Sequence, residues 1–453
     1  MSSADLVVVG GGVAGLVIAH DAVRAGLNVT LVEAADRVGG LLQRAEFGDI
    51  AFDIGAESFA TRTSGVADLI ADAGLPLTLV SPASGGAHLV TGAASGMLRA
   101  PLPRRTVLGI PADPSAADVV RILGSDGAAR LAAERDLPAL TAADEPSLAE
   151  LVATRCGPLV LERLVEPLCQ SVYSQPAGAV RLSRLHPMLW RAAVSGGSLL
   201  AGAEACATDD RAGAAVGGIA GGMWRLAAEL DGAARAQGAQ IRTGVSVLRL
   251  TPEEGSVAVI TAEAVLRAER VVVATGSAAA RALLEPADAP LESTRRVRVI
   301  AALVDTSAFD VRPVGSGVIV APTVPSAAKA LTHANAKWPW LDETLPPGRH
   351  LFRLSARAAD TPGLETPDDL AREITLLTGI AVDPGDIIAS TATDYPDAVV
   401  RAPVDDLRRS ELRTAGIHLA GASVAGAGLA SVIPHARDLA ASLSSVSSSR
   451  STV

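Results

Sequence analysis

The sequence predicts an α/β protein that begins with a Rossmann-type dinucleotide-binding unit, and three observations carry this prediction. An apolar strand, residues 6–9, runs directly into glycines at positions 10, 12 and 15. A helical segment follows that turn, and a second apolar strand, residues 28–33, ends in an acidic residue. A β-α-β unit with this glycine spacing is typical of proteins that bind the pyrophosphate of a dinucleotide.

A separate physical requirement explains why glycine stands at each of these positions in the turn. Gly10 permits a tight turn, Gly12 lets the backbone approach a pyrophosphate, and Gly15 lets the helix pack close to the strand. The N-terminus of the helix then stabilises negative charge. Glu33, at the end of the second strand, suits a ribose hydroxyl, and at this point NAD and FAD are both admissible. The candidate pyrophosphate-binding residues are Gly10, Gly11, Gly12, Val13, Ala14 and Gly15.

The segment after Glu33 favours a flavin over a nicotinamide cofactor. It places Arg37 near the phosphates and presents a further pair of glycines, Gly39 and Gly40. A simple NAD domain needs neither feature. The stretch resembles the Glu-Arg-Gly-Gly signature of FAD flavoproteins of the amine oxidase and protoporphyrinogen oxidase type.

Composition excludes several other classes of protein. The 453 residues exceed a single ordinary core, so two or more domains are expected. A net charge of −10 and 2% aromatic residues argue against nucleic-acid binding. The three cysteines, Cys156, Cys169 and Cys206, have neither zinc-site spacing nor an even number, so we expect buried thiols and no metal site.

The N-terminal strand begins by residue 6, which leaves no room for a secretory signal, and no apolar run approaches the roughly 18 residues of a spanning helix. A cytoplasmic protein is therefore expected. The mean hydropathy of +0.34 leaves peripheral membrane contact open.

The pattern along the chain indicates discontinuous domains. Helical spacing dominates residues 148–152 and 160–165, whereas strand-like runs return at 270–276, 297–304 and 317–320. A strand at 417–421 precedes a final helix that is expected to end at Leu443. The predicted parts are a cofactor domain of residues 1–75, 215–290 and 408–443, a mixed α+β substrate domain of residues 76–114 and 291–407, a helical subdomain of residues 115–214, and a serine-rich disordered tail, residues 444–453.

Further segments extend the resemblance over nearly the whole chain. They are residues 52–59, 102–113, 147–150, 165–168 and 329–339. With them the chain resembles the FAD-dependent coproporphyrinogen III and protoporphyrinogen oxidases of the Gram-positive type. This resemblance implies an amine oxidase-like flavoprotein fold: a Rossmann-type FAD-binding domain, a mixed α+β substrate domain and a helical insertion.

The resemblance also implies the rest of the FAD site. The segment Gly55, Ala56, Glu57 and Ser58 would lie along the flavin, and the backbone of Val247 would hold the adenine. Gly421 would approach the pyrophosphate. Gly428 and Leu429 would bring the N-terminus of the last helix toward the flavin, where its positive dipole stabilises the charge of the reduced ring.

The implied reaction is a six-electron oxidation of coproporphyrinogen III to coproporphyrin III in heme biosynthesis, in three hydride transfers to the flavin. Molecular oxygen then reoxidises the flavin and hydrogen peroxide is released. No protein nucleophile is required, and no catalytic residue is assigned. A heme-pathway enzyme as partner and the oligomeric state stay open.

The four propionates of such a substrate need cationic partners. We favour Arg62, which follows the flavin-lining segment, and Tyr173 is a candidate for the cavity wall. The other cations near family-like motifs are Arg44, Arg99, Arg104, Arg105 and Lys337.

Three departures from the family pattern keep other functions open. Tyr395 stands where a tryptophan is common, Ala430-Ser431 where Pro-Asp is common, and residues 173–176 replace a turn with Gly-Asp. The alternatives are a protoporphyrinogen IX oxidase, an amine oxidase or desaturase, and a catalytically weak flavoprotein that binds porphyrin.

Overall fold

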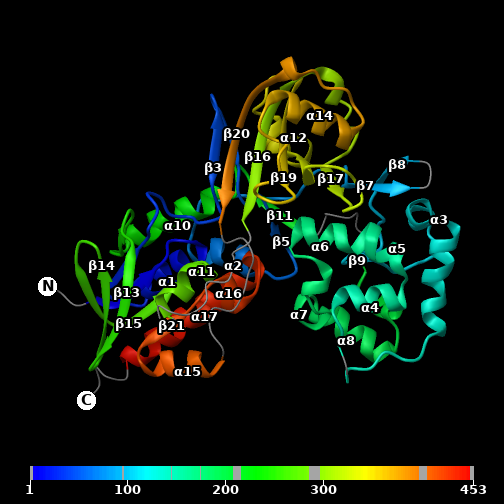
Figure 1. Ribbon diagram of the computed structural model, residues 1–453. Coiled ribbons are helices and arrows are strands. Elements are labelled where there is room, and N and C mark those ends of the chain that lie inside the picture. Colours follow the sequence, from blue (N-terminus) through cyan, green and yellow to red (C-terminus); the bar gives the residue numbers. More distant parts are fainter. Residues whose placement is uncertain are drawn as a thin grey trace. The chain divides into compact units, whose positions relative to one another are not determined.

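The computed structural model describes residues 4–93, 96–143, 145–173, 175–207, 216–284, 296–396 and 406–448 (Figure 1). The chain forms two compact units, and both are discontinuous in sequence. The first unit comprises Met1–Val80, Val216–Arg296 and Tyr395–Val453, and the second comprises Ser81–Ala215 and Val297–Asp394.

The first unit is built on a mixed sheet whose centre is parallel. The four neighbours β12, β2, β1 and β15 run parallel, β21 pairs in parallel with β15, and β14 and β13 continue the sheet as an antiparallel meander. In spatial order the strands are β12 (Gln240–Arg242), β2 (Val29–Val32), β1 (Ala4–Val9), β15 (Val265–Val273), β14 (Ser256–Thr261) and β13 (Val247–Glu253), with β21 (Ile417–Leu419) beside β15.

Strand β1 is apolar on both faces because both faces of the sheet are covered. Leu6 and Val8 enter one hydrophobic cluster, whereas Val7 and Val9 enter another on the opposite face. A continuous apolar run is the sequence signature of such a doubly covered strand. The first cluster is completed by helices α1 (Val13–Arg24), α10 (Trp224–Ala236) and α17 (Leu429–Ser448), and α1 and α17 lie side by side (Figure 1).

Smaller elements complete the first unit. Strands β3 (Arg44–Phe47) and β4 (Ile50–Asp53) form a hairpin, and β11 (Val216–Ile219) pairs with both β5 (Phe59–Ala60) and β6 (Leu79–Val80). The remaining helices are α2 (Gly65–Asp72), α11 (Ser277–Leu284), α15 (Asp406–Thr414) and α16 (Ala422–Ala425).

The second unit contains its own mixed sheet. In spatial order its strands are β20 (Ile387–Tyr395), β16 (Val297–Asp305), β19 (Arg349–Ala356), β18 (Ala328–His333), β17 (Gly317–Val320), β7 (His88–Ala93) and β8 (Gly96–Pro101). Helix α14 (Pro367–Thr378) shares one hydrophobic cluster with this sheet. A capping box of Thr366 and Asp369 fixes where that helix begins.

A second cluster joins Leu89 of β7 and Ala100 of β8 to a group of helices. These helices are α3 (Ala117–Ala132), α4 (Leu148–Arg155), α5 (Pro158–Val160), α6 (Glu166–Val172), α7 (Leu182–Leu185), α8 (Pro187–Gly196) and α9 (Leu199–Cys206). The short strands β9 (Thr106–Val107) and β10 (Ile110–Pro111) and helices α12 (Ala334–Lys337) and α13 (Pro339–Asp342) also belong to this unit.

The helical stretch at 115–214, which the sequence predicts as a subdomain, falls in the same compact unit as the β7 to β20 sheet. The final helix α17 continues past Leu443 to Ser448, and residues 208–215 and 449–453 lie outside the described ranges.

The extension of α17 has a local explanation. Leu443 is buried in the first unit's core, and the Arg270 guanidinium donates a hydrogen bond to its carbonyl oxygen. Serine hydroxyls at 444 and 445 donate to carbonyl oxygens one turn earlier instead of ending the helix. Within the described part of the chain, none of the helices is long and apolar enough to cross a membrane.

Candidate functional site

The turn between β1 and α1 has the geometry that its glycines predict. Gly10 has φ +108°, and a Cβ atom at Gly15 would lie 2.0 Å from the Gly10 carbonyl oxygen. At Gly12, by contrast, an added Cβ would have no described atom within 4 Å. Gly10 and Gly15 are therefore required by the protein's own packing, whereas Gly12 borders open space.

The first turn of α1 favours an anion beside this open space. The helix begins at Val13, the residue before it caps no amide with a side chain, and the first turn carries no acidic residue. The first N–H groups of a helix lack intrahelical acceptors and carry a partial positive charge. A phosphate at this position would accept hydrogen bonds from them.

Glu33 ties the end of β2 to the glycine turn. Its Oε2 atom accepts a hydrogen bond from the Gly11 amide at 2.6 Å, and its Oε1 atom accepts one from the Ala35 amide at 2.8 Å. A carboxylate has about four acceptor positions, so these two bonds leave capacity for a ribose hydroxyl. The residue thus positions the loop as well as offering an acceptor.

The second pair of glycines packs directly onto the first turn. The Gly39 amide donates to the Gly11 carbonyl oxygen at 2.8 Å, and a Cβ at Gly40 would lie 3.3 Å from the Gly12 Cα. Arg37 braces this turn by donating to the carbonyl oxygens of Val38 and Gly40. The structure therefore brings together both glycine motifs.

Segments distant in sequence also reach this turn. Gly421 has φ +94°, and a Cβ there would lie 3.8 Å from the Cβ of Ala14 on α1. The Val245 amide donates to the Glu33 carbonyl oxygen at 2.9 Å, which places the start of β13 and Val247 next to β2. Gly428, with φ +87°, and Leu429 stand at the start of α17, which packs along α1.

The predicted flavin-lining segment, Gly55, Ala56, Glu57 and Ser58, follows β4 and is joined to the glycine pair through Leu41. The Ala56 amide donates to the Leu41 carbonyl oxygen at 2.9 Å. A Cβ at Gly55 would lie 2.0 Å from that oxygen and 2.8 Å from the Tyr395 hydroxyl, so only glycine fits.

Sequence reasoning did not single out Asp53, although the structure gives it a central position. Its side chain is 6% exposed and accepts hydrogen bonds from the Met223 amide at 2.7 Å and the Trp224 amide at 3.0 Å. It therefore caps the start of α10 from the end of β4, two residues before Gly55. The sequence feature that could have pointed to Asp53 is the position of this acidic residue at the end of an apolar strand.

The predicted substrate contacts fall in different units. Arg62, in the first unit, donates to the Ser431 hydroxyl of α17 at 2.8 Å. Tyr173, in the second unit, follows α6 and packs against the helical cluster, and residue 174 lies outside the described residues. Among the other candidate cations, Arg99 donates two hydrogen bonds to the Leu376 carbonyl oxygen.

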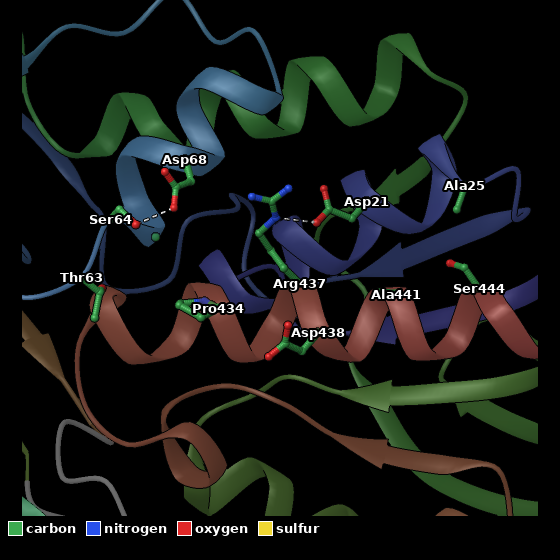
Figure 2. A pocket seen from close by; sticks show the side chains of 11 residues that line it. Asp21, Ala25, Thr63, Ser64, Asp68, Pro434, Arg437, Asp438, Ala441 and Ser444 are labelled. Atoms are coloured by element: carbon green, nitrogen blue, oxygen red, sulfur yellow. Dashed lines mark hydrogen bonds and ion pairs between the residues drawn. The ribbon is translucent and has the colours of Figure 1, made fainter. Parts of the chain in front are cut away.

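A cavity of about 660 Å³ lies elsewhere in the first unit, between α1, the start of α2 and α17 (Figure 2). Figure 2 shows Arg437 of α17 reaching Asp21 of α1, with Nε to Oδ2 at 3.2 Å. The same guanidinium pairs with Asp72 at 2.8 Å. None of the predicted site residues lines this cavity, and the ion pairs tie three helices together.

The glycine turn, the open space at Gly12 and the acceptor at Glu33 fit a bound dinucleotide. The fold and this site together define a Rossmann-type nucleotide-dependent enzyme with a second α/β unit. The chain belongs to the family of flavin containing amine oxidoreductases, whose model matches residues 13–438. The dinucleotide of this family is FAD, so the protein is an FAD-binding oxidoreductase.

Two of the relatives to which the chain is similar are coproporphyrinogen III oxidases. The chain is 32% identical over 409 residues to the coproporphyrinogen III oxidase of Mycobacterium tuberculosis strain H37Rv, a match that covers 85% of each chain. It is 30% identical over 203 residues to the coproporphyrinogen III oxidase of Bacillus subtilis, covering 44% of this chain and 42% of the relative.

A crystal structure from Exiguobacterium sp. 255-15, provisionally assigned as a protoporphyrinogen oxidase, is similar in fold. Its TM-score is 0.80 at 23% identity, and the match covers 98% of this chain and 100% of the other. Cyclohexylamine oxidase from Brevibacterium oxydans matches with a TM-score of 0.66 at 18% identity, covering 99% and 100%. These likenesses establish the amine oxidase-like fold.

Proposed function

We propose that the protein is an FAD-dependent coproporphyrinogen III oxidase. The observation that carries the proposal is the similarity to the mycobacterial enzyme, which is 32% identical and extends over 85% of both chains. Coproporphyrinogen III is then the substrate, molecular oxygen the electron acceptor, and coproporphyrin III and hydrogen peroxide the products.

The first unit would hold the cofactor. In the proposal the amides at the start of α1 bind the pyrophosphate across Gly12, and Gly421 borders the same group. The Glu33 carboxylate accepts a hydrogen bond from a ribose hydroxyl, and the Val247 backbone holds the adenine. Arg37, Gly39 and Gly40 extend the phosphate site, because they pack on the first glycine turn.

The remaining candidates would serve the flavin end. Gly55 to Ser58 line the ring, and the positive end of the α17 dipole, at Gly428 and Leu429, stabilises negative charge there. Bound FAD supplies two-electron acceptance, so a six-electron oxidation takes three turnovers. The protein residues orient the substrate and exclude water, and none has to act as a nucleophile.

The test is a fluorescence assay on the purified protein. Under air, the FAD-loaded protein should convert coproporphyrinogen III to fluorescent coproporphyrin III, with hydrogen peroxide formed at about three per porphyrin. Faster turnover of protoporphyrinogen IX would transfer the assignment to that substrate. Flavin-loaded protein that oxidises neither would leave the alternative of a porphyrin-binding flavoprotein.

The proposal includes a cytoplasmic location, in keeping with a water-soluble tetracarboxylate substrate. Sedimentation with anionic and neutral liposomes decides whether the protein also contacts membranes. Analytical ultracentrifugation determines its oligomeric state.

A further inference from the structure

The segment before α2 is fixed to the start of helix α17. Pro434 lies inside α17 and has no N–H group, so it cannot donate the usual hydrogen bond to the carbonyl oxygen of Ala430, four residues earlier. The Thr63 hydroxyl donates to that oxygen instead, at 3.2 Å (Figure 2). A Cβ at Gly65 would lie 2.9 Å from Pro434 Cγ, so the two segments also pack closely. These contacts determine where Arg62, the residue before Thr63, can reach.

Arg62 reaches the first turn of α17 and finds a neutral partner there. Its guanidinium donates to the Ser431 hydroxyl at 2.8 Å. Among the described residues, no carboxylate forms an ion pair with Arg62, and the next carboxylate along the chain, Asp68, accepts from the Ser64 hydroxyl at 2.6 Å. Ser431 is part of the departure Ala430-Ser431 from the family pattern. This departure therefore leaves the Arg62 charge without an anionic partner.

The helix itself adds positive charge at the same place. Helix α17 begins at Leu429, its first turn carries no acidic residue, and Ser431 is its third residue. The first N–H groups of a helix carry a partial positive charge, so anions are favourable at this end and cations are not. The Arg62 guanidinium and the start of α17 thus form a positive region that a negatively charged ligand group would stabilise.

We propose that Arg62 stabilises the negative charge of the reduced flavin ring, and that Ser431 is the positioning residue that holds its guanidinium at the start of α17. The inference rests on the part of the proposed function that places the flavin ring at Gly428 and Leu429. A hydride delivered to the bound cofactor brings two electrons and one proton, which leaves one negative charge on the ring. A fixed cation nearby favours this charged state over the neutral oxidised ring.

This role differs from the propionate contact that the sequence predicts for Arg62. A propionate contact would change the affinity for a porphyrin, whereas the proposed role changes how readily the flavin takes up negative charge. The Arg62 side chain is exposed, so solvent screens its field and the effect is moderate. A full charge on the ring is about twice the half charge of a helix end, which corresponds to an effect of roughly threefold to tenfold on an equilibrium constant.

Sulfite tests the proposed role without a porphyrin and without turnover. Its addition to the oxidised flavin ring also leaves negative charge on the ring, so its Kd responds to the same field. Each FAD-loaded protein is titrated with sulfite and followed by flavin absorbance, and the flavin midpoint potential is measured alongside. Arg62→Gln should raise the Kd for sulfite roughly threefold to tenfold and make the midpoint potential more negative. Arg62→Lys, which keeps the charge, should restore most of the affinity.

Ser431→Asp gives a second signature, because it places a carboxylate beside the guanidinium. It should raise the Kd for sulfite as Arg62→Gln does, yet increase the thermal stability of the protein, since an acidic residue is favourable in the first turn of α17. A merely structural role of the serine predicts lower stability and an unchanged Kd for sulfite.

The control is Arg267→Gln, which changes the net charge by the same amount. Arg267 pairs with Glu253 at 3.0 Å and lies six residues before the end of β15 that borders the glycine turn, about 20 Å along the strand. This distance exceeds the screening length at physiological ionic strength. The Kd for sulfite should therefore match that of the unaltered protein.

The outcomes keep this inference separate from the proposed function. Weaker sulfite binding in Arg62→Gln and Ser431→Asp supports the inference even where coproporphyrinogen III is not oxidised, a result that would overturn the proposed function alone. Unchanged sulfite affinity and midpoint potential in a folded, FAD-loaded Arg62→Gln protein overturn the inference. Weaker binding of coproporphyrin III by that variant, with unchanged sulfite affinity, also overturns it and assigns Arg62 to a propionate.

Discussion

Replacing Gly12 by alanine tests whether this glycine is needed for folding of the protein or for binding of FAD. Gly12 has φ −68° and ψ 177°, a conformation open to any residue, and an added Cβ would meet no described atom within 4 Å. The cofactor-free protein should therefore accept Gly12→Ala with a change of less than about 1 kcal/mol in its free energy of unfolding, because the restriction of the unfolded chain offsets the poorer N-cap of α1.

The same substitution should weaken the binding of FAD. A methyl group in the space that the pyrophosphate is proposed to fill pushes the phosphate away from the amides of α1. Each hydrogen bond to a charged group contributes about 1.5–3 kcal/mol. Loss of one such bond predicts a Kd for FAD that rises about tenfold to a hundredfold, and loss of two predicts a larger rise.

Two further substitutions serve as controls for Gly12→Ala. Gly232→Ala, in an exposed turn of α10 with open space around it, should stabilise the protein by up to about 1 kcal/mol and leave FAD affinity unchanged. Gly15→Ala should destabilise even the cofactor-free protein, because of the 2.0 Å approach to the Gly10 oxygen.

The assay titrates FAD into the deflavinated proteins by fluorescence, with thermal denaturation of each cofactor-free protein alongside. A Gly12→Ala protein that binds FAD as tightly as the unaltered one would refute the proposed position of the pyrophosphate.

Three other substitutions test single features. Burial lowers the pKa of His333 to about 3, so between about pH 6 and pH 4 this histidine takes up a proton only in the unfolded chain. The protein's free energy of unfolding should therefore fall by about 1.4 kcal/mol per pH unit over this range, and His333→Gln should flatten this slope in urea denaturation. Arg437→Met, which removes the ion pairs of Arg437 with Asp21 and Asp72, should cost about 1 kcal/mol in thermal denaturation, whereas Arg135→Met, at an exposed pair, should change stability by less than about 0.5 kcal/mol. Asp53→Asn should cost about 2 kcal/mol and weaken FAD binding in the same titration, and an unchanged FAD affinity would show that capping of α10 does not position the flavin segment.

Local sequence signals account for the parts of the fold that depend on neighbouring residues. The glycines from Gly10 to Gly15 are predictable because a β-α turn and its phosphate-binding amides lie within a few residues. Gly421 lies beside α1 only through tertiary folding, and the resemblance to known flavoproteins, not its own local pattern, pointed to it.

Other features depend on contacts that the local pattern does not encode. The serine-rich end of α17 has the composition of a disordered tail, yet burial of Leu443 and the hydrogen bond from Arg270 hold it helical. Asp53 was missed because its role depends on partners on another segment, the amides at the start of α10.

The most direct test of the central assignment is oxidation of coproporphyrinogen III by the purified, FAD-loaded protein under air, followed by porphyrin fluorescence against a flavin-only control. The account predicts a visible spectrum of bound FAD and coproporphyrin III formation well above the control rate, with hydrogen peroxide released. Protein that carries FAD but leaves coproporphyrinogen III to oxidise at the control rate would contradict it.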